Sequence, residues 1–264
     1  MVTEKATRAP EQTTHVPGTP VDLDRLVAIK TLLAAEDDEA AQSLARFKGE
    51  AQALARLNHP NIVPIFEYDD RTEGFPFMVM EFVDGGTLRQ KMDDDGMQAA
   101  KAVEYVRQIL DGLSASHAIG VIHRDIKPSN ILVTLHDGVP VPKVIDFGIA
   151  KATSQLRLTD RTLFTAFAQF IGTPAYMSPE QAEGGAVDTR SDLYSLGATL
   201  YHLLAGQPPF GGTTSLAVAL AHVRDRHRPL PEVRGDLPER RHAPSLFGRI
   251  DADRYRIGPR NTCW

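Results

Sequence analysis

Cysteine is almost absent from this sequence, and long apolar runs are missing. The single cysteine, Cys263, excludes an internal disulfide framework and a cysteine-based zinc site. No stretch reaches the roughly 18 uncharged apolar residues expected of a membrane span, and the first 20 residues lack the apolar core of a signal peptide. We therefore expect a protein of a reducing, cytoplasmic compartment with no membrane span.

An excess of positive charge is also missing. The chain has 264 residues, of which 42% are hydrophobic, and a formal net charge of −5. Because there is no overall basic field, nucleic acid is not an expected partner. The length and apolar content suffice for a sizeable core, in one large domain or two lobes.

Hydrophobic periodicity is missing from residues 1–21, which are predicted to be a disordered tail. Residues 22–83 then predict a small lobe with a helix over 37–57 and a hairpin of strands 62–66 and 77–82. Residues 84–255 predict a mainly helical lobe, with one helix ending near Gly120 and another over 191–204, followed by a tail, 256–264. The buried stripe of the first of these helices is predicted at Val103, Val106, Leu110 and Leu113.

Two segments between these helices are too polar for core strands and too apolar for free loops. The first, VIHRDIKPSNILV, holds Arg124, Asp125, Lys127 and Asn130, and the second, KVIDFG, ends a strand at Asp146. A hairpin between the segments would bring Asn130 and Asp146 together. Their side-chain oxygens suit Mg²⁺, whose remaining ligands would be substrate phosphates and water.

Four motifs, VAIK, HRDIKPSN, DFG and GTPAYMSPE, follow one another along the chain. Together they resemble the eukaryotic-like serine/threonine protein kinases of the bacterial type, over about residues 22–230. The resemblance implies an α+β, bilobal protein-kinase-like fold. A small, incomplete β-rich N-lobe with the hinge would take residues 22–83, and a larger helical C-lobe would take 84–255, poorly matched after 240.

The same resemblance assigns the catalytic and metal-binding residues. Asp125 would be the base that accepts the proton of the substrate hydroxyl, and Lys127 would contact the transferring phosphate. Asn130 and Asp146 would hold Mg²⁺. A lysine two residues after the base is the pattern of kinases that act on serine and threonine, and the expected partners are therefore protein substrates with these hydroxyls. A second copy of the chain would be a partner in autophosphorylation.

For ATP, the resemblance points to the hinge and to two charged residues of the N-lobe. Lys30 would contact the α- and β-phosphates while Glu50 orients it, because Glu50 lies beside the buried stripe of its helix and needs a cation. Backbone groups of Glu81 and Val83 would hydrogen-bond the adenine.

The resemblance also implies how the kinase would be regulated. Arg124 would pair with a phosphate on the activation segment, for which Thr165 is the first candidate site and Thr162 the second. Thr173 supports the serine/threonine assignment.

The resemblance also gives structural roles to two carboxylates of the C-lobe, Asp192 and Glu180. Asp192 would brace the catalytic loop. Glu180 would anchor the end of the activation segment, with Arg254 as its expected partner.

Simpler readings of the same residues stay open. Lys30 could protect an edge strand against aggregation. Asp125 and Asp146 could be loop caps for backbone N–H groups. The seven arginines from Arg234 to Arg260 could form a solvated face or bind a phosphorylated tail.

The glycine-rich loop of the family, G-x-G-x-x-G, is missing ahead of Lys30, because residues 1–26 contain only Gly18. Two strands and the loop between them are therefore expected to be absent, as a late start codon or a truncation would produce. Two functions follow: an ATP- and Mg²⁺-dependent kinase with impaired nucleotide binding, or a catalytically inactive kinase-like scaffold or fragment that acts by binding proteins.

Overall fold

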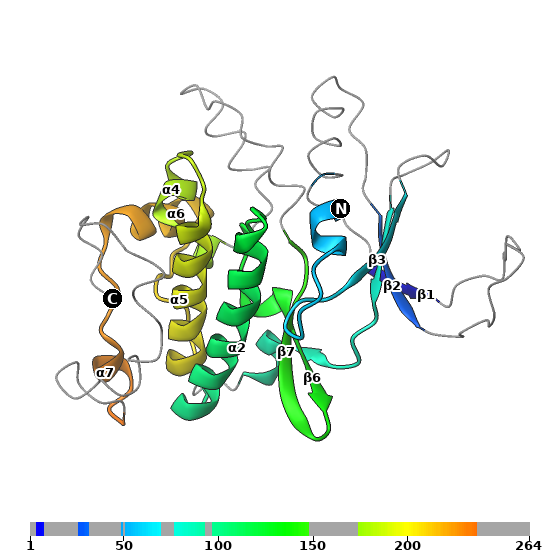
Figure 1. Cartoon of the computed structure of the whole chain (residues 1–264). Helices are drawn as coiled ribbons and strands as arrows, with labels where there is room; N and C mark the ends of the chain where they lie inside the picture. The colour runs from blue at the N-terminus through cyan, green and yellow to red at the C-terminus, as the bar shows by residue number, and fades with distance from the viewer. Residues whose placement is uncertain are drawn as a thin grey trace, which may run out of the picture.

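The computed structural model has two lobes joined by a short connection (Figure 1). It describes residues 4–7, 26–31, 49, 51–69, 77–92, 97–147 and 174–236. A sheet forms one lobe and helices form most of the other, with a β-hairpin between them. This is the α+β, bilobal arrangement predicted from the sequence.

The small lobe is built on an antiparallel sheet whose strands follow the order β1-β2-β4-β3. Its strands are β1 (Glu4–Thr7), β2 (Val27–Thr31), β3 (Ile65–Asp69) and β4 (Phe77–Glu81). Strands β3 and β4 form the predicted hairpin. Strand β3 begins later than predicted, because Val63 donates its N–H to Val144 of the other lobe and so leaves the sheet.

Strand β1 lies inside the segment predicted to be a disordered tail, so that prediction is wrong for residues 4–7. The strand pairs with β2 in a register that sets Glu4 opposite Lys30 and Thr7 opposite Val27. Backbone pairing with an otherwise open sheet edge supplies order that side-chain periodicity does not reveal. A short strand therefore precedes β2 in the chain and pairs with it.

The large lobe is organised around two long helices, α2 (Ala99–Ala118) and α5 (Thr189–Ala205), which lie side by side. Both predicted helices are confirmed. Shorter elements surround them: β5 (Gly86–Thr87), η1 (Leu88–Lys91), η2 (Pro128–Asn130), η4 (Pro174–Tyr176), α4 (Pro179–Ala182), α6 (Ser215–Arg224) and α7 (Leu230–Val233). None of the helices in the described ranges is long and apolar enough to cross a membrane.

A hairpin of β6 (Ile131–His136) and β7 (Val139–Val144) carries the two polar segments identified in the sequence. Its turn residues, Asp137 and Gly138, both have positive φ, at 52° and 79°. This geometry matches the right-handed twist of antiparallel strands, and Asp-Gly adopts it readily. The register pairs Ile131 with Val144, and just outside the hairpin the carbonyl oxygen of Asn130 accepts the N–H of Ile145 at 3.0 Å.

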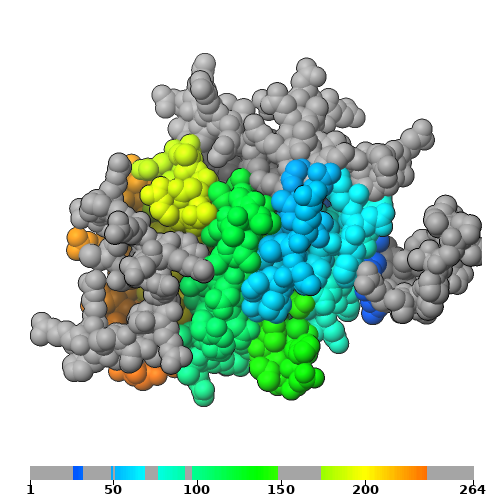
Figure 2. Space-filling view, viewed as in Figure 1, coloured from blue at the N-terminus to red at the C-terminus, as the bar shows by residue number. Residues whose placement is uncertain are grey.

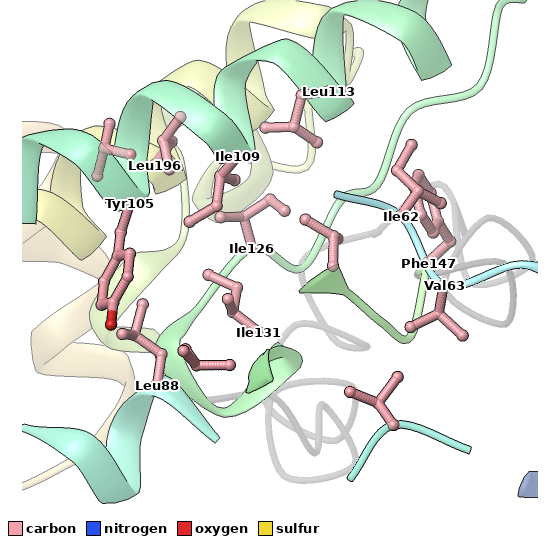
Figure 3. Packing of buried hydrophobic residues seen from close by; sticks show 14 of the residues in the cluster. Ile62, Val63, Leu88, Tyr105, Ile109, Leu113, Ile126, Ile131, Phe147 and Leu196 are labelled. Atoms are coloured by element: carbon pink, nitrogen blue, oxygen red, sulfur yellow. The ribbon is translucent and has the colours of Figure 1, made fainter. Parts of the chain in front are cut away.

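The hydrophobic core runs from the small lobe under α2 to the catalytic segment (Figure 3). Ile109 and Leu113 of α2 are fully buried. Ile126 and Ile131, on either side of η2, are at most 1% exposed. On the surface, residues 51–60 lie between α2 and the strands of the small lobe (Figure 2). The polar segment 121–130 is therefore held by apolar residues on both sides.

Candidate active site

The catalytic segment is fixed from below by the buried carboxylate of Asp192 on α5. Its Oδ2 accepts the backbone N–H of His123 at 2.8 Å, and its Oδ1 accepts that of Arg124 at 2.7 Å. His117 Nε2 lies 2.8 Å from the same Oδ2. Asp192 has no exposed surface, so these hydrogen bonds replace the solvent that its charge would otherwise require. Arg124 takes a positive φ of 67° at this point.

His123 is a structural residue of the segment. It is fully buried, and burial lowers the pKa of its imidazole, so the ring is neutral. Its Nδ1 accepts the N–H of Asp125 at 3.2 Å, which leaves Nε2 to donate to the carbonyl oxygen of Ile145 at 2.9 Å. The ring also packs on Phe147, with centroids 4.7 Å apart. One neutral imidazole thereby joins the segments around Asp125 and Asp146.

Two polar side chains converge on Asp125. Lys127 Nζ donates to Asp125 Oδ2 at 2.8 Å, and Asn130 Nδ2 donates to the same oxygen at 3.0 Å and to the Asp125 carbonyl at 2.9 Å. The Lys127 and Asp125 side chains are 16% and 19% exposed. The carboxylate is thus held in one orientation beside a cation while remaining open to solvent.

Lys30 reaches this site from strand β2. Its Nζ lies 2.5 Å from Oδ1 of Asp146, with side-chain exposures of 14% and 31%. Asp146 has a positive φ of 57°, which turns its side chain at the end of β7. The sequence predicted Glu50 as the partner of Lys30. Glu50 lies outside the described residues, and Asp146 is the partner that the structure gives.

The hinge follows β4 directly. Glu81 donates its N–H to the carbonyl oxygen of Pro64 at 3.0 Å, and its side chain accepts from Lys143 at 2.6 Å. Val83 is buried at 9% exposure. A Cβ at Gly85 would lie 2.3 Å from the carbonyl oxygen of Val133, so only glycine permits the close approach of the hinge to β6.

The elements that follow the activation segment are tied to the same centre. Gln181 of α4 donates to the carbonyl oxygen of Arg124 at 2.8 Å. Glu180 accepts a hydrogen bond from Ser191 of α5. In η4, Tyr176 contacts His202 of α5 with its hydroxyl at 2.5 Å from Nδ1. Arg254, the predicted partner of Glu180, lies outside the described residues, as do Thr162, Thr165 and Thr173.

A magnesium ion fits the donors that the chain offers here. The amide nitrogen of Asn130 is used toward Asp125, and its Oδ1 makes no hydrogen bond within the part of the chain that the structure describes. Oδ1 and the Asp146 carboxylate supply the hard oxygen atoms that Mg²⁺ prefers, in the small number usual where phosphates and water complete the shell. No group of three or more His, Cys, Asp or Glu residues suited to a metal ion occurs among the described residues.

Sequence reasoning missed three contributors to this site: His117, Gln181 and Lys143. His117 carries no motif of its own, and its side chain, 6% exposed, lies against Asp192. Gln181 has a detectable signal, because Ser178 three residues earlier completes a capping box at the start of α4. Lys143 lies inside β7, directly before the buried Val144.

Comparison with known proteins agrees with this geometry. Residues 17–243 match the protein kinase domain. The chain is 44% identical over 226 residues to the serine/threonine-protein kinase PknB of Mycobacterium leprae, covering 84% of this chain and 34% of that protein. It is 42% identical over 219 residues to the probable serine/threonine-protein kinase PknB of Lactococcus lactis, covering 82% and 33%.

The fold is also found among solved structures. The crystal structure of a double mutant of the Mycobacterium tuberculosis PknI kinase domain matches with a TM-score of 0.59 and 27% identity, over 84% of this chain and 75% of that chain. The chain spans about a third of the length of the curated relatives it matches. With its matched domain, its bilobal fold and these relatives, the chain belongs to the protein kinase family, among the bacterial eukaryotic-like serine/threonine kinases.

Proposed function

We propose that this chain transfers the γ-phosphoryl group of ATP to serine and threonine hydroxyls of proteins. One observation carries the proposal: Asp125 is held by Lys127 and Asn130 on a segment that His123 ties to Ile145. The next residue along the chain is Asp146, the partner of Lys30. A base, cations and metal-binding oxygens are the parts that phosphoryl transfer needs, because that reaction depends on positioning and charge stabilisation. The names of the relatives support the same substrate class.

Each residue has a defined part in this reaction. Asp125 orients the substrate hydroxyl and accepts its proton, and Lys127 moves from the carboxylate to the transferring phosphate. Lys30 exchanges its contact with Asp146 for the α- and β-phosphates. Asn130 Oδ1 and Asp146 would hold Mg²⁺, which neutralises phosphate charge when bound. Backbone groups of Glu81 and Val83 bind the adenine.

The activation segment supplies control in this proposal. Arg124 pairs with a phosphate on Thr165, or on Thr162, and so orders the segment through charge-assisted hydrogen bonds. Mass spectrometry of active protein is expected to find one of these threonines phosphorylated. A fully active protein with neither threonine modified would contradict this part.

Replacing Asp125 with Asn tests the proposed function. The substitution keeps shape and hydrogen bonding but removes the base, so turnover is expected to fall by about 10²-fold or more while nucleotide affinity changes little. Asp137→Asn is the matched control, because Asp137 is exposed in the hairpin turn and Asn tolerates its positive φ. Equal transfer of labelled phosphate by wild type and Asp125→Asn would overturn the assignment.

A kinase-like scaffold is the second candidate function. The shortage of glycine ahead of Lys30 favours it, since residues 1–26 contain only Gly18 and a phosphate-binding loop usually needs several glycines. A scaffold does not require the polar arrangement around Asp125, and that arrangement favours the kinase. Labelled ATP with a generic basic protein substrate separates the two functions, because a scaffold transfers no phosphate at any enzyme concentration.

A further inference from the structure

Lys143 is a mostly buried lysine in the middle of the site, and none of the roles assigned above uses it. Its Nζ lies 2.6 Å from Oε2 of Glu81 at the end of β4. The side chains are 16% and 35% exposed, so the lysine is the more deeply placed partner. The pair joins the last strand residue of the small lobe to strand β7 of the other lobe.

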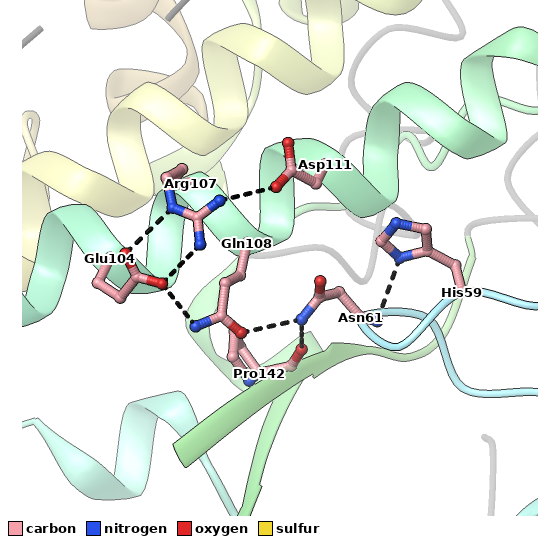
Figure 4. Close-up of polar contacts among 7 residues, drawn as sticks. All are labelled: His59, Asn61, Glu104, Arg107, Gln108, Asp111 and Pro142. Atoms are coloured by element: carbon pink, nitrogen blue, oxygen red, sulfur yellow. Dashed lines mark hydrogen bonds and ion pairs between the residues drawn. The ribbon is translucent and has the colours of Figure 1, made fainter. Parts of the chain in front are cut away.

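The backbone of Lys143 is fixed on both sides by one residue, Asn61 (Figure 4). Asn61 Nδ2 donates to the carbonyl oxygen of Pro142 at 2.8 Å, and its carbonyl oxygen accepts the N–H of Val144 at 2.8 Å. Asn61 Nδ2 also lies 3.2 Å from Gln108 Oε1 of α2. The backbone from which the Lys143 side chain extends is therefore held in place.

Glu81 is fixed from the same segment. Its N–H donates to the carbonyl oxygen of Pro64, three residues after Asn61. The ion pair thus closes a ring that runs from Asn61 through Pro64 and Glu81 to Lys143 and back through β7. The backbones of both partners are thus held at a fixed separation, across which the two side chains meet.

The charges need each other. Among the described residues, Glu81 is the only carboxylate within ion-pair distance of Lys143. A lysine that is 16% exposed and loses its anion pays a desolvation penalty without compensation. Glu81 is more exposed and can recover solvent when Lys143 is removed. The two single substitutions are therefore unequal.

We infer that the Lys143–Glu81 ion pair is a positioning device for the nucleotide, which rests on the function proposed above. Glu81 supplies backbone groups for the adenine. Lys143 lies near the end of β7, three residues before Asp146. The pair sets the separation between the adenine-binding hinge and the metal-binding carboxylate. Neither side chain touches the reacting atoms.

The test measures Mg·ATP affinity and turnover in four proteins: wild type, Lys143→Met, Glu81→Gln and the charge-reversed double variant Glu81→Lys with Lys143→Glu. Lys143→Met is expected to raise the dissociation constant and the KM for ATP by about tenfold, with kcat reduced less than threefold. Glu81→Gln is expected to be worse, since it leaves the buried ammonium unpaired. The double variant is expected to recover most of the affinity.

Arg190→Met is the matched control, because it removes an exposed ion pair with Asp188 at the start of α5, where the side chains are 71% and 44% exposed. It is expected to leave affinity unchanged. Melting temperatures of all variants separate nucleotide effects from unfolding. If wild type binds ATP and Lys143→Met binds it equally well, or if charge reversal restores nothing, the inference is overturned while the proposed function stands. A wild type that binds no Mg·ATP at any concentration overturns both.

Discussion

Asp192 shows how one buried carboxylate organises a functional segment at the scale of a single residue. It accepts the backbone N–H groups of His123 and Arg124 and contacts His117, all without exposure to solvent. The Asp192→Asn variant replaces one acceptor oxygen with an N–H group that faces a donor. We expect a loss of about 3 kcal/mol or more in the free energy of unfolding, the scale of a broken buried charge network.

Urea denaturation measures this loss, and Asp188→Asn is its control. Asp188 caps α5 through the N–H of Arg190, is partly exposed, and Asn is an equally good cap. A change below about 0.5 kcal/mol is expected there. Equal effects of the two substitutions would show that Asp192 braces nothing.

His222 predicts a pH dependence of stability. The imidazole is 5% exposed beside Tyr194 and Phe210, and burial lowers its pKa to about 4 from 6.5. The unfolded chain therefore binds the proton more tightly than the folded chain, and stability is lost as pH falls below 6.5. Between pH 7.5 and 5.5 we expect wild type to lose about 1 kcal/mol more than His222→Gln.

Urea midpoints of both proteins at the two pH values check this difference. His136→Gln is the control, because the His136 side chain is 82% exposed in the hairpin turn. It should keep the wild-type pH dependence. His202, whose pKa burial also lowers to about 4, remains in both proteins and cancels in the comparison.

At the scale of elements, the register of the small sheet reveals which way the backbone groups of β1 point. Glu81 directs its N–H to Pro64, away from β2, so its partner Val27 also directs its backbone groups away from β4 and toward β1. Backbone groups alternate along a strand, so Ile29 faces β1 as well. The residues opposite them, Thr7 and Lys5, therefore hydrogen-bond to β2.

Proline substitution tests this assignment. Lys5→Pro removes an N–H that points at β2, whereas Ala6→Pro removes one that points away from it, where edge strands tolerate proline. We expect Lys5→Pro to speed hydrogen exchange of the Ile29 and Val27 amides by about tenfold and Ala6→Pro to change it less than twofold. The reverse order would refute the register, and equally fast exchange in wild type and both variants would show that β1 does not protect β2.

The two long helices of the large lobe were readable from the sequence, but the exact face that α2 buries was not. For α2 the apolar spacing predicted Val103 and Leu110 in the core, but both are only partly buried. The buried face instead includes small residues. Ala102 is fully buried, and Gly112 lies so close to Asn61 that an added Cβ would be only 3.3 Å from it. Close approach by Ala and Gly produces no hydrophobic signal, so the stripe is rotated from its predicted place.

In the site, contacts between residues close in the sequence were predictable, and contacts between the two lobes were not. Asp125, Asn130 and Asp146 lie on local motifs joined by one hairpin, so their proximity follows from the chain itself. The contact of Lys30 with Asp146 spans 116 residues and depends on how the two lobes meet. No local pattern contains that information, and the same holds for Lys143 and Glu81.

At the scale of the whole molecule, nucleotide binding depends on the backbone N–H groups that can reach the phosphates beside Lys30. A glycine-rich loop would provide several backbone N–H donors to the phosphates, each contributing about 1.5 to 3 kcal/mol as a hydrogen bond to a charged group. Residues 1–29 hold one glycine, Gly18, although β1 already occupies the edge of β2. Loss of two or three such donors corresponds to about 10² to 10⁵ in combined affinity and turnover.

We therefore expect residues 1–264 alone to bind Mg·ATP weakly and to phosphorylate slowly. A strand followed by a G-x-G-x-x-G turn, added ahead of β1, should restore both, because the new strand can pair with the outer edge of β1 and place the turn over Lys30. An added strand and turn of equal length with alanine at the three glycines is the control, since Cβ atoms keep the backbone away from the phosphates. Calorimetric titration and turnover assays on the three proteins decide the question. Micromolar affinity in the original chain, with turnover of about 1 to 100 per second, would show that β1 and its neighbours already supply the missing donors.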